Sequence, residues 1–127
     1  AAAAATLPCV PQLKNVVEFA AQLDDGGEWV HCVQVPKRGK KGHKYLRDVE
    51  NPSIVQEVSD ARMYGLNGRK KKRAANENLM AIYPGTTCFY AANTVGPSSG
   101  TELTVHFGGE PETQIYTIPL RYTFDLR

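Results

Sequence analysis

The stretch that most constrains the fold is 101–127, TELTVHFGGEPETQIYTIPLRYTFDLR, in which apolar and polar residues alternate in two runs. A period of two predicts strands with one buried and one solvated face. Gly108, Gly109 and Pro111 lie between the runs and predict a hairpin with a longer loop. Pro119 has no N–H to donate, which predicts an edge or a bulge there. The apolar positions are Leu103, Val105 and Phe107, then Tyr116, Ile118, Leu120, Tyr122, Phe124 and Leu126.

Turn residues divide the rest of the chain into short runs. Residues 13–23 satisfy both strand and helix spacing, but the DDGG turn at 24–27 and the alternating run after it favour strand–turn–strand. Runs 78–83 and 86–92 are predicted strands around Pro84-Gly85. Asn67-Gly68 is the strongest short hairpin signal, since both residues tolerate the positive φ of a type I′ turn.

Two segments are less regular. Residues 36–48 combine basic residues with glycines and predict a loop. Residues 54–64 fit either a short helix capped by Ser53 or a strand that leads to the next turn.

Together these signals predict an all-β, mainly antiparallel fold, a compact sandwich or barrel that is jelly-roll-like at best. Roughly six to eight short strands and at most one or two short helices are expected. Residues 1–12, with five alanines and two prolines, predict a flexible N-terminal arm. Residues 13–127 predict a single β-rich domain, and an apolar content of 42% is normal for a globular core.

Several classes of function find no support. The three cysteines are widely spaced, and no Cys or His pair has the spacing of a metal site. The segment 96–100, GPSSG, matches G-x-S-x-G but is followed by a predicted strand where a nucleophile elbow requires a helix. No run approaches the ~20 apolar residues of a membrane helix. We therefore expect a soluble protein that is not an enzyme and has no cofactor, metal, membrane partner or small-molecule substrate.

Charge is distributed unevenly. The net charge is only +2, but segments 37–47 and 69–73 contain eleven basic residues and no acidic one. Dense basic segments in an otherwise acidic chain attract polyanions. The predicted nucleic-acid-binding residues are Lys37, Arg38, Lys40, Lys41, Lys44, Arg47, Arg69, Lys70, Lys71, Lys72 and Arg73. Tyr45 and Tyr64, near these segments, are candidates for stacking on bases.

The ending QIYTIPLRYTFDLR resembles the last strand of small icosahedral viral coat proteins, which finish a β-sandwich with a long alternating strand. The resemblance implies a capsid protein of the virion, a self-assembling structural subunit. Its partners would be copies of itself, as a homo-oligomer or shell, and packaged nucleic acid, RNA or single-stranded DNA. The expected location is the virion or the host cell interior.

Two alternatives remain open. Basic loops and aromatic residues also fit a single-stranded nucleic-acid-binding β-barrel of the OB type, in the cytoplasm or nucleus. The strand pattern of 78–120 also has a weaker resemblance to fimbrillin-type pilins, which implies a pilus-like adhesion module.

Overall fold

The computed structural model describes residues 16–24, 26–67, 72–96 and 100–126. Within them the chain is all-β and antiparallel, with two 3-10 turns and no α-helix, which confirms the predicted fold class. The elements are β1 (Glu18–Gln22), β2 (Trp29–Gln34), β3 (His43–Asp48), β4 (Val55–Ser59), η1 (Asp60–Arg62), β5 (Met63–Gly65), β6 (Asn78–Ile82), β7 (Cys88–Thr94), β8 (Glu102–Phe107), β9 (Tyr116–Pro119), η2 (Leu120–Tyr122) and β10 (Thr123–Phe124).

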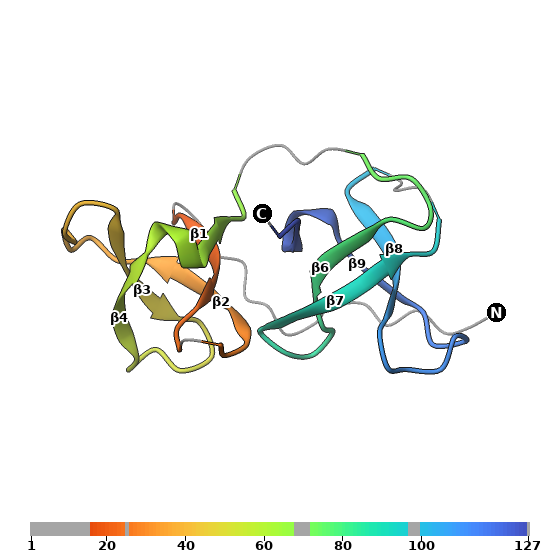
Figure 1. The fold of residues 1–127 in the computed structure, drawn as a ribbon, viewed down its shortest axis with the longest axis horizontal. Coiled ribbons are helices and arrows are strands. Elements are labelled where there is room, and N and C mark those ends of the chain that lie inside the picture. Colours follow the sequence, from red (N-terminus) through yellow and green to blue (C-terminus); the bar gives the residue numbers. More distant parts are fainter. Residues whose placement is uncertain (1–15, 25, 68–71, 97–99, 127) are drawn as a thin grey trace.

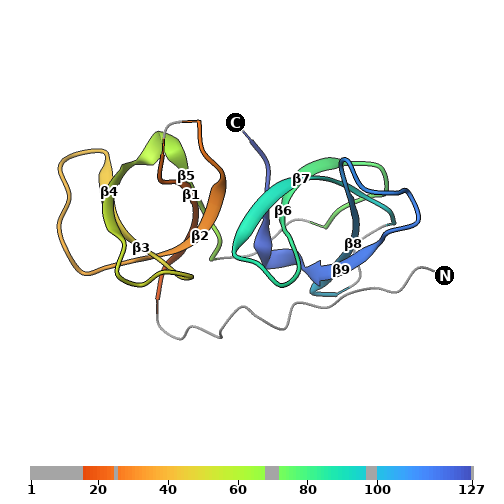
Figure 2. The same cartoon turned by 90° about the horizontal axis from the view of Figure 1, so that it is seen from below.

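The strands curl into two lobes that share one sheet (Figures 1 and 2). Strands β1 to β5 form the N-terminal lobe, and β6 to β9 form the C-terminal lobe. The order β10-β6-β7-β2-β1-β5 runs through both lobes, because Trp29 and Val30 in β2 pair with Phe89 and Cys88 in β7. After β9 the chain returns between the lobes, where β10 pairs with β6 (Figure 2).

Three predicted hairpins form. At the first, β1 and β2 pair around a turn in which Gly27 N donates to Asp24 O over 2.9 Å. Pro84-Gly85 joins β6 to β7, and Gly85 has a φ of 80°, a left-handed value that glycine adopts without strain. The hairpin of β8 and β9 also forms, with Leu103 opposite Ile118.

The hairpin predicted at Asn67-Gly68 is wrong. Strand β5 pairs with β1, whereas β6 pairs with β7 and β10. The Asn67 side chain accepts a hydrogen bond from Glu18 N and donates to Val16 O, so it holds the start of β1. Gly68 lies outside the described residues. The buried pairing of β1 with β5 prevails over the local turn signal.

The single long strand expected over 114–127 is also wrong. Strand β9 ends at Pro119. Among the described elements β9 pairs with β8 alone, so Pro119 lies on an edge strand, as predicted. The 3-10 turn η2 then redirects the chain. Ile118 and Leu120 pack inside the C-terminal lobe, whereas Phe124 packs between the lobes, so the predicted apolar face serves two cores.

Residues 43–48 form strand β3 rather than the expected loop, because Leu46 is buried in the N-terminal lobe. Residues 54–64 take the strand alternative, as β4 and β5 around η1. Ser59, not Ser53, caps that 3-10 turn, through a hydrogen bond from Ala61 N to its hydroxyl.

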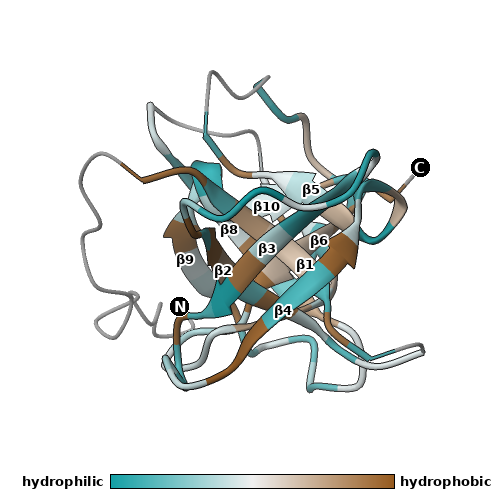
Figure 3. Cartoon of the chain, turned by 90° about the vertical axis from the view of Figure 1, so that its left-hand side faces the viewer, coloured by the Kyte–Doolittle hydropathy of each residue, from teal (hydrophilic) through white to brown (hydrophobic). Residues whose placement is uncertain are grey.

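The buried apolar residues form three clusters, one inside each lobe and one between the lobes. Figure 3 shows hydrophobic colour mainly on the strands and hydrophilic colour on most connections. We call the third cluster the seam. Its members are Ala20, Leu66, Ile82, Phe89, Tyr122 and Phe124, with Trp29, Tyr64 and Met80 packed against them.

Candidate functional site

The basic residues of 37–47 surround β3 and the connection before it. Lys37 Nζ lies 4.3 Å from the centroid of the Tyr45 ring, and Lys44 Nζ lies 3.0 Å from Asp60 Oδ1. Arg47 donates to Pro52 O, a contact that fixes the turn before β4. Most of this set is exposed, namely Lys37, Arg38, Lys40, Lys41 and Arg47.

The second basic segment lies largely outside the described residues, since Arg69, Lys70 and Lys71 are not described. Lys72 is exposed. Arg73 makes two hydrogen bonds to Asp125 and one to Glu77, and these contacts raise its pKa. Arg73 thus serves in part to hold segments of this chain together. Polyanion binding by the remaining basic residues stays a prediction.

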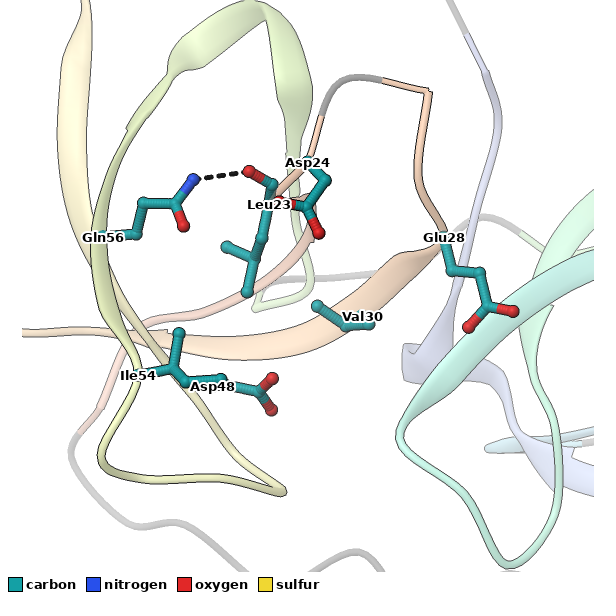
Figure 4. Close-up of a pocket in the computed structure, with 7 residues that line it drawn as sticks. All are labelled: Leu23, Asp24, Glu28, Val30, Asp48, Ile54 and Gln56. Atoms are coloured by element: carbon teal, nitrogen blue, oxygen red, sulfur yellow. Dashed lines mark hydrogen bonds between the residues drawn. The ribbon is translucent and has the colours of Figure 1, made fainter.

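An acidic pocket opens at the end of the N-terminal lobe (Figure 4). It encloses about 420 Å³, and its lining among the described residues contains three carboxylates and no basic side chain. Asp24 lies in the turn after β1, Glu28 immediately precedes β2, and Asp48 ends β3. The hairpin turns therefore bring together acids that are distant in sequence, and like charges so placed favour a cation. The apolar and neutral part of the lining is Leu23, Val30, Ile54 and Gln56.

A cluster of four aromatic rings lies on the C-terminal lobe. Tyr83 follows β6, Tyr90 lies in β7, Phe107 ends β8 and Tyr116 begins β9. The Tyr83 centroid is 4.9 Å from that of Phe107, 5.4 Å from that of Tyr116 and 6.1 Å from that of Tyr90, which it meets edge-on. Tyr90 is 39% exposed and Tyr83 is half-buried, so these two rings reach the surface, whereas Phe107 and Tyr116 are buried in the core of the C-terminal lobe.

A carboxylate adjoins the aromatic cluster. Glu110 Oε2 accepts hydrogen bonds from Tyr83 Oη at 2.6 Å and from Tyr116 Oη at 3.3 Å. The hydrogen bond to Glu110 raises the Tyr83 pKa, so this phenol stays neutral at physiological pH. Rings with negative faces beside a carboxylate make a region of negative potential that suits an organic cation.

Glu28 connects the acidic pocket with the aromatic cluster. It lines the pocket, and its Oε1 accepts a hydrogen bond from Tyr90 Oη at 3.2 Å. Burial is the main cause that raises the Tyr90 pKa to about 12, so this hydroxyl stays protonated and donates. The two sites therefore share a boundary where the lobes meet.

Sequence reasoning missed both sites. The two predicted base-stacking residues lie elsewhere, because Tyr45 packs under Lys37 and Tyr64 packs on Phe124 in the seam with centroids 4.5 Å apart. The rings of the aromatic cluster lie in β7, β8 and β9 and directly after β6. In the sequence, the alternation of the predicted strands already explained why these positions are apolar or aromatic. No motif within one segment marks them.

Other chemistry finds no support among the described residues. They contain no group of three or more His, Cys, Asp or Glu side chains placed to hold a metal ion. Cys32 is buried and Cys88 half-buried, both as free thiols, whereas Cys9 lies outside the described part. Ser98, the middle residue of GPSSG, also lies outside it. Across the described ranges, no helix has the length and apolar character needed to cross a membrane.

The fold and the two sites define a small all-β binding module that presents aromatic and acidic side chains. A family model described as SGF29 tudor-like domain matches residues 14–127, and the chain belongs to this family. A search of curated proteins gave no match.

Family membership overturns the viral coat interpretation. The match includes the ending on which that resemblance rested, so the capsid function, the shell of identical copies and the packaged nucleic acid are all wrong. The OB-type binder and the pilus-like module are likewise not the family found. Alternation reports that a strand has one buried face, and this property is common to antiparallel folds of every function.

Two expectations, on catalysis and on location, agree with the family in full and in part respectively. The family is a non-catalytic binding module, which confirms that the protein is not an enzyme. Of the expected locations, the family supports the nucleus and not the virion.

Proposed function

We propose that this protein is a chromatin reader that binds the tail of histone H3 methylated at lysine 4, as a module of the SAGA coactivator complex. The exposed side of the aromatic cluster, formed by Tyr83 and Tyr90, takes the methylated ammonium group. The acidic pocket takes a second cationic group of the same tail. The observation that carries the proposal is the aromatic cluster with Glu110 beside it, in a chain that belongs to the SGF29 tudor-like family.

The aromatic cluster has the chemistry that a methylated ammonium requires. Methylation keeps the positive charge but removes N–H donors, so a protein recognises this group through aromatic faces rather than through hydrogen bonds. Cation–π contacts of this kind contribute about 0.5–2 kcal/mol each. Tyr83 and Tyr90 supply two rings at an interplanar angle of 86°, which is suited to contact a rounded cation from two sides.

The acidic pocket supplies a complementary attraction. Histone tails are strongly basic, and three carboxylates draw a basic peptide and hold one of its cations. Since Glu28 belongs to the pocket and also bonds Tyr90, a peptide on one site lies beside the other.

The test is isothermal titration calorimetry with H3 tail peptides that are unmodified or trimethylated at lysine 4. We expect the methylated peptide to bind at least about tenfold more tightly, as two or more cation–π contacts imply. Tyr83→Ala and Tyr90→Ala should each abolish most of this preference. Tyr45→Ala is the matched control, because that ring lies on the N-terminal lobe under Lys37. Equal affinity for the two peptides would refute the proposal.

A further inference from the structure

A buried carboxylate lies beside the seam and has partners from distant parts of the chain. Glu18 is 1% exposed, and its Oε1 lies 2.8 Å from His31 Nε2. Its Oε2 accepts a hydrogen bond from Arg121, and Tyr122 Oη donates to its Oε1 over 3.4 Å. Glu18 belongs to β1 and His31 to β2, whereas Arg121 and Tyr122 belong to η2. The contacts therefore tie the N-terminal lobe to the segment that follows the C-terminal lobe.

Because the packing around Glu18 is apolar, the contacts of Glu18 favour one arrangement of the two lobes. The seam is otherwise formed by apolar and aromatic packing, such as Trp29 and Tyr64 against Phe124. Apolar packing is weakly directional, and a seam of this kind tolerates small shifts between the lobes. A buried carboxylate without its partners is costly, so only the lobe arrangement that satisfies Glu18 is favoured.

The network connects to both binding sites through the backbone. On one side, β1 leads from Glu18 to the turn that carries Asp24 of the acidic pocket. On the other side, η2 leads into β10, which pairs with β6, and β6 ends next to Tyr83 of the aromatic cluster. Glu18 thus lies where the chain segments that lead to the pocket and to the cluster come into contact.

We propose that Glu18 is a positioning residue that sets the spacing between the acidic pocket and the aromatic cluster, and thereby the spacing of the two cationic groups that one peptide can present. The inference rests on the proposed function, because it assumes that one ligand occupies both sites. Glu18 itself touches no ligand in this scheme.

The decisive variant is the double substitution Glu18→Leu with His31→Leu. Replacing both partners of a buried hydrogen bond by apolar residues of similar shape can leave stability nearly unchanged while it removes the directional contact. Glu18→Gln, close in shape, is the second variant, and it keeps the site polar without the charge. Circular dichroism verifies that both are folded.

Two probes distinguish a change in the spacing between the two sites from a change within either site. Free trimethyllysine engages the aromatic cluster alone, and an H3 tail peptide trimethylated at lysine 4 engages both sites. We expect the double variant to bind trimethyllysine like the native protein, as followed by NMR shifts of Tyr83 and Tyr90. Its affinity for the peptide should fall by about tenfold, because the effective concentration at the second site is lost.

A ligand-free measurement completes the test. Residual dipolar couplings should give one alignment tensor for both lobes of the native protein and differing tensors in the double variant. Unchanged peptide affinity, or a common tensor in the double variant, would overturn the inference. Failure of the native protein to bind either probe would refute the proposed function instead, and the couplings would still decide whether Glu18 positions the lobes.

Discussion

Tyr90 Oη donates a hydrogen bond to Glu28 Oε1 over 3.2 Å, although the two residues are 62 positions apart and belong to different lobes. The ring that is most exposed in the aromatic cluster is thereby oriented by a carboxylate of the acidic pocket. The paired backbones of β2 and β7 hold these residues side by side, since Val30 is opposite Cys88.

Tyr90→Phe removes this hydrogen bond and keeps the ring. We expect affinity for the trimethylated H3 peptide to fall by about two- to fivefold, which corresponds to a partly exposed hydrogen bond of ~0.5–1 kcal/mol. Calorimetry measures the change, and Tyr45→Phe is the control. A loss as large as that of Tyr90→Ala would show that the hydroxyl, and not the ring, provides the binding energy.

Asp24→Asn removes one charge from the acidic pocket. We expect affinity for the H3 peptide to fall by a few fold at low ionic strength and by less at 1 M salt, where the Debye length is ~3 Å. Glu102→Gln makes the same change in net charge on an exposed residue at the start of β8, in the other lobe. If both variants weaken binding equally, the effect is one of net charge and not of the pocket.

His31 gives the protein a pH-dependent stability. Burial lowers its pKa from 6.5 to about 4, against the opposing charge of Asp48. Glu18 and Tyr122 are its other titratable neighbours, and Arg121 contacts the same Glu18 carboxylate. Between these two pH values the unfolded chain binds a proton that the folded chain does not. Stability is thus complete above pH 6.5 and falls as the pH drops towards 4, by up to ~1.4 kcal/mol per pH unit.

Urea unfolding followed by Trp29 fluorescence at pH 7 and pH 5 tests this dependence, because Trp29 is the sole tryptophan and packs in the seam. His31→Leu should lose less stability between the two pH values than the native chain. An identical loss would assign the pH dependence to other groups.

Arg73→Ala should destabilise the fold more than Lys72→Ala does. Arg73 makes paired hydrogen bonds to Asp125, one of them at 2.6 Å, and we expect a cost of ~1–2 kcal/mol after allowance for the exposure of the carboxylate. Lys72 is exposed, and its replacement should cost less than ~0.5 kcal/mol. Chemical denaturation measures both, and equal costs would count against the Arg73–Asp125 contact.

We propose that residues 13–127 form one folding domain despite the two lobes, because one sheet and one seam cross the boundary. Thermal unfolding should then give a single transition, with far-UV circular dichroism and Trp29 fluorescence coincident. Two separated transitions would mean that the lobes fold independently.

Turn and strand signals within short stretches of sequence predicted much of the fold. The turns at 24–27 and 84–85 act within a few residues, and their hairpins form as expected. The errors arise where distant segments decide the outcome. Leu66 is buried in the seam and its N–H donates to Glu18 O, and this pairing with β1 leaves Asn67 unable to start a hairpin with β6.

The candidate site was beyond the reach of the sequence for a related reason. Eleven basic residues in two segments are conspicuous in a linear reading, whereas the aromatic cluster is assembled from Tyr83, Tyr90, Phe107 and Tyr116 only once four strands have paired. Among the acids of the pocket, Asp24 belonged to the predicted turn at 24–27, and nothing in the sequence linked it to Glu28 or Asp48. Asp24 and Asp48 converge because β1, β2 and β3 are neighbours, which no spacing rule reveals.

The position of β10 between the lobes bears on how the chain folds during synthesis. Tyr122 and Phe124 complete the seam, and they follow β1 to β9 of the described elements in the sequence. Because a ribosome releases the chain from its N-terminal end, the strands of both lobes emerge before the residues that fill the seam between them. Newly made lobes therefore expose Trp29 and Phe89 until η2 and β10 emerge, and nascent chains halted before η2 should be the ones that chaperones retain.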